Sequence, residues 1–498
     1  MARVDERPFP PGEYDVVVVG SGPGGLQTAY SLARTGIERV AVLSRDEAPG
    51  GMFRRFPVYQ RLISWTRPEA PFAHGTREYE WYDHNSLVGD EPAHQALLPR
   101  FMDRTMDLPT RLEMESALAA FAERGAVRVR YGCEWQATGR EGDRLVLSTS
   151  DGEYECRVAV FALGVTEPWR PSITGLEDVP HYVDTHSPER YAGKRVLIVG
   201  KRNSGFEIAH GLLPWAQEIT LVSPRPVETA VLAFSPLRVR YLQPYEEHAR
   251  GGAGTFVIDA ALERVERTNG AYRVHASGTS RPGSLELEAD ELVFATGFRT
   301  PLRDLPQLGV ATVDEGRLPA QTPYWESVSA PGIYFAGNAT QGSPGLRKYG
   351  ATSSSSSVNG FRYNARVLAR RIAERHFGIA PKRPRLPHER VVPFLLGELA
   401  RAPELWIQKG YLARVVTLDG DARDDGVLPL EDFVDSGGPD AVAAAIELDG
   451  HATIVPVVYV RRGGRVAEHV LPPHPLYAFD SDEHRRELEA RLRPLLGC

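Results

Sequence analysis

The feature that most constrains this chain is an ordered set of buried strand, glycine-rich turn and helix that occurs twice. Residues 14–20 form a continuous apolar run that ends in glycine, and Gly22, Gly24 and Gly25 follow it. Such a run is typical of a strand buried on both faces of a parallel sheet. The next apolar residues recur at helical spacing, and residues 40–43 are predicted to form a second strand. We therefore predict a β-α-β unit whose turn and helix N-terminus bind a dinucleotide pyrophosphate.

The second occurrence departs from the usual glycine spacing. Residues 194–200 are predicted to form a strand, but Arg202 replaces the middle glycine of the turn that follows. The next strand, residues 218–222, is followed by Ser223 and Arg225 where an acidic residue would hold the ribose of NADH. Arginine and serine can bind a 2′-phosphate, so the sequence favours NADPH. The alternative is a fold relic that binds no nucleotide.

Later strands predict how these units are arranged. Short alternating runs follow each unit, and each set ends in a buried strand and a glycine, at residues 160–164 and 292–297. This pattern predicts an α/β protein with two Rossmann-like dinucleotide-binding domains, one inserted into the other. The predicted boundaries are 1–170 and 291–380 for the outer domain, 171–290 for the inserted domain, and 388–498 for a small C-terminal α+β domain of unassigned role, reached through a stiff basic linker at 381–387.

Composition and charge exclude several classes of protein. The formal net charge is −7 and no dense Lys/Arg run occurs, which disfavours a nucleic-acid partner. Cys133, Cys156 and Cys498 form no Cys-x-x-Cys pair and no zinc spacing, so a disulfide scaffold, a metal site and a dithiol centre are disfavoured. We expect no signal peptide and no membrane span, and therefore a cytoplasmic protein. A homodimer is one expectation, because soluble proteins commonly form homo-oligomers.

These motifs resemble those of the flavin-containing monooxygenase superfamily over about residues 14–375. The most specific match is the Ala295-Thr296-Gly297 stretch that follows a buried strand. The resemblance implies FAD at the first turn, in the outer domain, and NADPH at the second, in the inserted domain. It also implies that a loop beginning at Gly50 wraps the flavin, and that a late strand ends against it at Asn338.

The expected contacts divide by ligand, and no catalytic side chain or metal is expected because the flavin carries the chemistry. The residues expected to bind FAD are Gly20, Gly22, Gly24, Gly25, Arg45, Asp46, Gly50, Gly51, Met52, Phe53, Gly337 and Asn338, with Asp46 as the candidate for the ribose. The residues expected to bind NADPH are Gly200, Arg202, Asn203, Ser204, Ser223, Arg225, Ala295, Thr296 and Gly297.

The resemblance also implies a reaction. In that family NADPH reduces the flavin, the reduced flavin adds O2 to give a hydroperoxide, and a nucleophilic substrate atom attacks the distal oxygen. The chain is most similar to bacterial enzymes of specialised metabolism, such as antibiotic biosynthesis, that N-hydroxylate a small amino acid, for example aspartate on its way to a nitro compound. We expect Arg347 and Lys348, together with Arg67 and Trp65, to bind the substrate and its carboxylate.

Other interpretations stay open. A flavoprotein reductase that inserts no oxygen has the same nucleotide motifs, and so does a non-enzymatic redox sensor. A Baeyer–Villiger or S-oxygenase is a further alternative, although Val165 stands where the family's signature histidine is expected. The serine run at residues 353–357 is expected either to cap the next helix or to contact a ligand directly.

Overall fold

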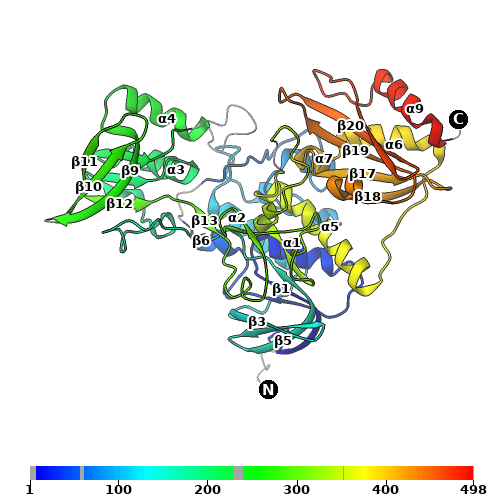
Figure 1. Ribbon diagram of the computed structural model, residues 1–498, viewed down its shortest axis with the longest axis horizontal. Helices are drawn as coiled ribbons and strands as arrows, with labels where there is room; N and C mark the ends of the chain where they lie inside the picture. The colour runs from blue at the N-terminus through cyan, green and yellow to red at the C-terminus, as the bar shows by residue number, and fades with distance from the viewer. Residues whose placement is uncertain (1–6, 57–60, 228–238, 269, 351–352, 497–498) are drawn as a thin grey trace.

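The computed structural model describes residues 7–56, 61–227, 239–268, 270–350 and 353–496. The described residues form three lobes, each built on its own larger sheet. Figure 1 shows the first lobe at the bottom centre, with the second (green) and third (orange to red) above it on opposite sides. Cys498 and residues 1–6 lie outside the described residues. The expectations that the chain has no Cys-x-x-Cys pair and no signal peptide rest in part on these residues.

The first lobe has a parallel core with an antiparallel extension. Successive residues of its central strand face opposite sides, so Val16 and Val18 pack against helices whereas Val17 and Val19 pack against the extension. The sheet order is β2 (Val40–Leu43), β1 (Gly12–Val19), β5 (Gly152–Phe161), β4 (Arg144–Thr149) and β3 (Trp135–Glu141), with β16 (Ile333–Phe335) also paired to β5. The helices are α1 (Pro23–Leu32), α2 (Arg111–Arg124) and α5 (Val358–Phe377).

The second lobe repeats the parallel core. Its sheet order is β11 (Ser284–Ala289), β10 (Ala271–Gly278), β9 (Thr255–Thr268), β8 (Glu218–Ser223), β7 (Arg195–Val199) and β12 (Glu291–Phe294), with helices α3 (Asn203–Leu212) and α4 (Val239–Arg250). The predicted return to the outer domain at residue 291 is too early, because β12 pairs in parallel with β7 inside this sheet. The chain crosses between the lobes through the antiparallel pair of β6 (Glu167–Pro168) and β13 (Phe298–Arg299).

The third lobe is an antiparallel sheet covered on both faces by helices. The sheet order is β18 (Arg423–Pro429), β17 (Leu412–Thr417), β19 (Ala441–Leu448), β20 (Ile454–Arg462) and β21 (Arg465–Val470). One face packs against α6 (His388–Arg401), α7 (Pro403–Ile407) and α9 (Asp482–Leu496), and the other against α8 (Leu430–Asp435). The predicted α/β class with two Rossmann-like units is confirmed.

Short elements complete the described chain. The remaining strands are β14 (Thr312–Val313) and β15 (Leu318–Pro319). The 3-10 helices are η1 (Gly51–Arg54), η2 (Glu78–Tyr82), η3 (Pro92–His94), η4 (Leu98–Arg100), η5 (Tyr182–Asp184), η6 (Pro188–Tyr191), η7 (Gly337–Gly342) and η8 (Lys348–Gly350). None of the helices that the structure describes is both long and apolar enough to cross a bilayer.

Candidate functional site

The first glycine-rich turn is built where side chains would collide with backbone. Gly20 has φ +119°, and a Cβ there would lie 2.5 Å from the Ala162 oxygen. A Cβ on Gly25 would lie 1.9 Å from the Gly20 oxygen. The helix α1 then begins without a side-chain cap, so its first N–H groups and its positive end stay available to an anion. This arrangement suits a pyrophosphate.

Two other segments cross this turn at bare backbone. A Cβ on Gly24 would lie 2.3 Å from the Gly337 Cα, and a Cβ on Gly51 would lie 2.9 Å from the Gly22 Cα. The Gly50 N–H donates to the Ser21 oxygen at 3.0 Å, which fixes the segment that leads into η1. The turn, η1 and η7 therefore meet at one place, with no side chain between them to fill the space beside the helix N-terminus.

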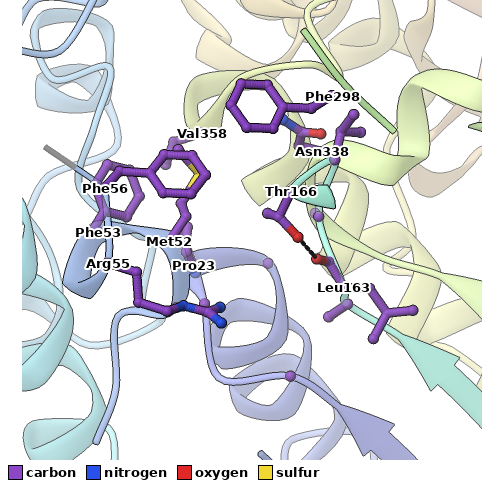
Figure 2. Close-up of a pocket in the computed structure, with 18 of the residues that line it drawn as sticks. Pro23, Met52, Phe53, Arg55, Phe56, Leu163, Thr166, Phe298, Asn338 and Val358 are labelled. Carbon is purple, nitrogen blue, oxygen red and sulfur yellow. Dashed lines mark hydrogen bonds between the residues drawn. The ribbon is translucent and has the colours of Figure 1, made fainter. Parts of the chain in front are cut away.

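A cavity of about 390 Å³ opens on this meeting point. In Figure 2, Met52, Phe53, Phe56 and Val358 lie on one side of it, with Thr166, Asn338 and Phe298 across from them. The residues predicted to bind FAD that line it are Gly20, Gly22, Gly24, Arg45, Asp46, Gly51, Met52, Phe53, Gly337 and Asn338. Gly25 and Gly50 lie directly behind the lining, inside α1 and just before η1.

Charged and hydroxyl groups gather where the cavity reaches the end of β2. Ser44 shares a hydrogen bond with the Ser21 hydroxyl at 2.8 Å and accepts one from the Asp46 N–H at 3.2 Å. Burial and the neighbouring Arg55 guanidinium lower the pKa of Arg45, while the Asp46 carboxylate opposes that shift. The Asp46 carboxylate, three residues after the end of β2, can accept hydrogen bonds from ribose hydroxyls.

The second turn follows the same steric rule and opens on the same cavity. Gly200 has φ +126°, and a Cβ there would lie 2.3 Å from the Ala295 oxygen. The helix α3 also begins without a side-chain cap, and Asn203 and Ser204 in its first turn line the cavity. The other residues predicted to bind NADPH, which do not line the cavity, are Gly200, Arg202, Ser223, Arg225, Ala295, Thr296 and Gly297. Arg202 and Arg225 are exposed beyond the cavity.

Sequence reasoning missed an ion pair at the sheet edge beside this turn. The Lys201 side chain is 2% exposed; its ammonium contacts the Asp259 carboxylate and donates to the Ile258 oxygen at 2.9 Å. Asp259 stands in register with Ser223 on the neighbouring strand, and the lysine lowers the pKa of its carboxyl. Lys201 thus neutralises the Asp259 carboxylate at the strand end where a phosphate is predicted. No spacing rule indicated it, because the two residues are distant in sequence.

The four residues predicted to bind the substrate do not line the cavity. Lys348 pairs instead with Glu447 at 3.0 Å and Glu468 at 2.7 Å in the third lobe, so its charge is already matched. Arg347 is exposed. Arg67 packs over the Trp65 ring at 5.5 Å, and Trp65 stacks against His84 with ring centroids 4.0 Å apart. The sequence could not show that the loop after η7 turns toward the third lobe.

Other side chains occupy the cavity wall. Ser64 and Asn85 line it, and the Asn85 amide donates to the Ser64 oxygen at 3.0 Å. Ser356 and Ser357 also line it. Ser357 is the residue before α5 but its side chain makes no capping bond, so the expectation that the serine run caps this helix is not met at Ser357.

A buried histidine stands beside the crossing between the first two lobes. The His181 ring lies edge-on to Phe298 with centroids 5.0 Å apart, and Phe298 lines the cavity. Burial, reinforced by the nearby Arg170 guanidinium, lowers the pKa of His181 to about 4. Val165, which stands at the position of the family's signature histidine, lines the cavity as an apolar residue.

Sequence comparison places these features in a family. Residues 17–337 match the family model described as "Pyridine nucleotide-disulphide oxidoreductase". FAD-dependent oxidoreductase domain-containing protein 2 of Danio rerio is 26% identical over 468 residues, which cover 82% of this chain and 65% of that protein. A ferredoxin--NADP reductase of Thermus thermophilus is 30% identical over 213 residues, which cover 40% of this chain and 58% of that protein. The chain thus spans less than two thirds of the length of these curated relatives.

Solved structures share the fold of about three quarters of the chain. A bacillithiol disulfide reductase from Staphylococcus aureus has a TM-score of 0.57 at 16% identity and covers 73% of this chain and 99% of its own. A flavin-containing monooxygenase from Stenotrophomonas maltophilia has a TM-score of 0.55 at 22% identity, covering 72% and 98%. An ornithine N-hydroxylase from Kutzneria sp. 744 has a TM-score of 0.54 at 19% identity, covering 73% and 100%.

Proposed function

This chain belongs to the pyridine nucleotide-disulphide oxidoreductase family, and we propose that within it the chain is an FAD- and NADPH-dependent monooxygenase that N-oxygenates the amino group of a small amino acid. The relatives support the coarser statement on their own: the chain is a flavoprotein oxidoreductase that uses FAD and NADP(H). Oxygen insertion and the amino-acid substrate are the parts that we propose.

The observation that carries the proposal is that two uncapped helix N-termini open on one cavity. The start of α1 and the start of α3 both line it, so a dinucleotide on each brings its reactive ring into shared space. Bound FAD would supply the redox chemistry between NADPH and O2 that the side chains of this site lack. The chain's own part is to orient both dinucleotides and to exclude water with apolar groups such as Phe56 and Phe298.

The described cysteines make an internal disulfide an unsuitable electron acceptor. Cys133 lies at the β2 end of the cavity, where its N–H donates to the Ser44 oxygen at 2.9 Å. Cys156 is buried in the sheet, and burial raises the pKa of its thiol to about 12. Neither is bonded to the other, and a protonated thiol is a poor nucleophile. A small acceptor that enters the cavity fits better.

The polar part of the lining suits an amino acid. Ser64, Asn85, Ser356 and Ser357 supply hydroxyl and amide groups on a wall that is otherwise mostly apolar. Such groups can orient an ammonium and a carboxylate without a catalytic acid or base of their own. The attacking amine must be neutral, so turnover is expected to rise toward alkaline pH.

The test is oxygen consumption by the purified yellow protein with NADPH and a panel of amino acids that includes aspartate. A substrate should increase oxygen uptake and give a product whose mass shows added oxygen on nitrogen, up to a nitro compound. A rate that is flat from pH 6 to 9 would contradict attack by a free amine.

A flavoprotein reductase without oxygen insertion is the second candidate. The similarity to ferredoxin--NADP reductases favours it. This function predicts rapid NADPH-dependent reduction of quinones or one-electron acceptors, and oxygen uptake that no amino acid increases. Flavin that binds but is not reduced by NADPH would contradict both candidates and support a sensor.

A further inference from the structure

The buried side-chain amide of Gln408 links the third lobe to segments that form the wall of the cavity. Gln408 lies between α7 and β17, and its side chain is fully buried. Its Oε1 accepts from the Ser354 N–H at 2.8 Å. Its Nε2 donates to the Asn364 Oδ1 at 2.6 Å and to the Ser355 hydroxyl at 3.1 Å. One side chain of the third lobe therefore binds the serine segment, residues 353–357, and the helix that follows it.

The partners of Gln408 permit a single orientation of its amide. The Ser354 N–H can only donate, so the Gln408 oxygen must face it. The Asn364 oxygen faces the Gln408 nitrogen because the Asn364 nitrogen is used elsewhere: it donates to the Thr340 hydroxyl at 3.1 Å. All polar atoms of the Gln408 amide are thus bonded, and reversing the amide would place like atoms against each other.

The same network continues to the turn that crosses α1. The Thr340 hydroxyl donates to the Gly337 oxygen at 2.6 Å. Gly337 is the residue whose backbone meets Gly24. Gln408 is therefore connected in two bonds to η7, and in one bond to the segment whose Ser356 and Ser357 line the cavity.

Close packing leaves the serine segment little freedom to adjust. A Cβ on Gly360 in α5 would lie 2.1 Å from the Ser354 oxygen, so the helix rests directly on the segment's backbone. The Ser357 N–H and hydroxyl both bond the same Ser354 oxygen at 3.1 Å. A displacement of Ser354 is therefore passed to the residues at the cavity wall.

A second anchor lies close to Gln408 in the chain. The Tyr411 hydroxyl donates to the Ser343 hydroxyl at 2.8 Å, just after η7. Tyr411 is 2% exposed, and a Cβ on Gly345 would lie 2.6 Å from its ring. Gln408 thus holds the serine segment, and Tyr411 holds the residues just after η7.

We propose that Gln408 is a positioning residue for the flavin: it holds the serine segment and η7 against the cofactor, so that the third lobe is a working part of the FAD site. The inference depends on FAD binding, which the family supports, and not on oxygen insertion or on the identity of the substrate.

The test compares Gln408→Leu with a docking control in the full chain. Leucine keeps the volume but leaves the Ser354 N–H and the Asn364 oxygen without partners. Arg77→Gln is the matched control, because Arg77 joins the same lobes through Glu398 at 2.8 Å and Glu404 at 2.9 Å but does not contact the serine segment. Apoprotein is reconstituted with FAD, and the dissociation constant is measured by flavin fluorescence. The visible circular dichroism of the bound flavin reports its environment.

We expect Gln408→Leu to raise the FAD dissociation constant about tenfold and to change the flavin dichroism, with the KM for NADPH unchanged at saturating FAD. Arg77→Gln should leave the FAD constant within about twofold. The inference is overturned if Gln408→Leu binds FAD with the wild-type constant and spectrum, or if Arg77→Gln weakens FAD equally.

A second variant keeps the test valid if Gln408→Leu does not fold. Tyr411→Phe removes only a hydroxyl and should raise the FAD constant about threefold, with the same direction of dichroism change. An unchanged constant in Tyr411→Phe, together with an unfolded Gln408→Leu, would count against the inference. Because the FAD dissociation constant and the flavin dichroism are measured without turnover, a failed oxygen assay leaves both of these readouts unaffected.

Discussion

The two glycine-rich turns share one steric rule and differ in what crosses them. Gly20 and Gly200 both have positive φ and face a carbonyl of the neighbouring strand, while Gly25 and Gly205 both face the carbonyl of that first glycine. These positions must be glycine in each turn, because a Cβ would collide with fixed backbone. The middle positions differ, with Gly22 and Gly24 in the first turn and side chains in the second.

The first turn needs glycine at its middle positions because neighbouring backbone packs against them, and not because a phosphate requires it. In the first turn the backbone of Gly51 and Gly337 passes within contact distance of Gly22 and Gly24. In the second turn Arg202 is exposed, so a side chain there has space. Arg202 in place of a glycine therefore does not by itself indicate a turn that has lost its function. The additional glycines of the first turn are explained by the backbone of Gly51 and Gly337 that packs against them.

Alanine substitution at one middle position of each turn should give the largest difference in ligand binding between the two turns. Gly24→Ala places a Cβ 2.3 Å from the Gly337 Cα, so we expect FAD affinity to fall more than about 100-fold and the protein to purify without colour. Ser204→Ala, at the equivalent place in the second turn, should keep its flavin and change the KM for NADPH less than about threefold. Flavin absorbance and NADPH kinetics measure the two. A yellow Gly24→Ala protein would refute the crossing argument.

Alanine substitution at the last glycine of each turn, Gly25 or Gly205, should show which turn binds FAD and which binds NADPH. Gly205→Ala puts a Cβ 2.3 Å from the Gly200 oxygen, so we expect the KM for NADPH to rise about 30-fold while flavin content is unchanged. Gly25→Ala, with its clash at 1.9 Å, should lose the flavin instead. The measurement is flavin stoichiometry beside steady-state kinetics. If Gly205→Ala lost its flavin and kept its KM, the assignment of the turns would be reversed.

Arg225 tests the predicted 2′-phosphate. Arg225 is exposed just after β8. A guanidinium at such a place attracts a phosphate but adds only modestly to the binding affinity. Arg225→Ala should raise the KM for NADPH about tenfold and leave the KM for NADH unchanged, so the ratio of the two is the readout. Equal changes for both coenzymes would place Arg225 away from the phosphate.

His181 tests how firmly the two lobes are joined, and its expected effect at neutral pH is the smallest. The unfolded chain takes up a proton on this histidine near its ordinary pKa of 6.5, whereas the folded chain does so only near 4. The unfolded state therefore binds more protons between these values, and stability falls as the pH falls through that window. His181→Leu should lessen the loss, measured as flavin release during acid titration. His186→Leu, at an exposed site, should not.

Local pattern predicted the regular elements well, because each was specified by short-range periodicity. The apolar run before Gly20 became β1, and the strand predicted at residues 40–43 is β2. The third lobe was predicted to be a small α+β domain, and it contains both helices and strands. Its contact with the cavity was not predictable, since Gln408 and Ser354 are paired only by how the lobes meet.

The four residues predicted to bind the substrate do not line the cavity, for the same physical reason. Lys348 has the charge and position in sequence of a carboxylate ligand, but two glutamates from the third lobe lie within 3.0 Å of it. What the amino-acid sequence determined is the pair of nucleotide folds, because strand, turn and helix signals act over a few residues. What only the tertiary structure decided is which side chains face the cavity, because that depends on contacts between segments hundreds of residues apart.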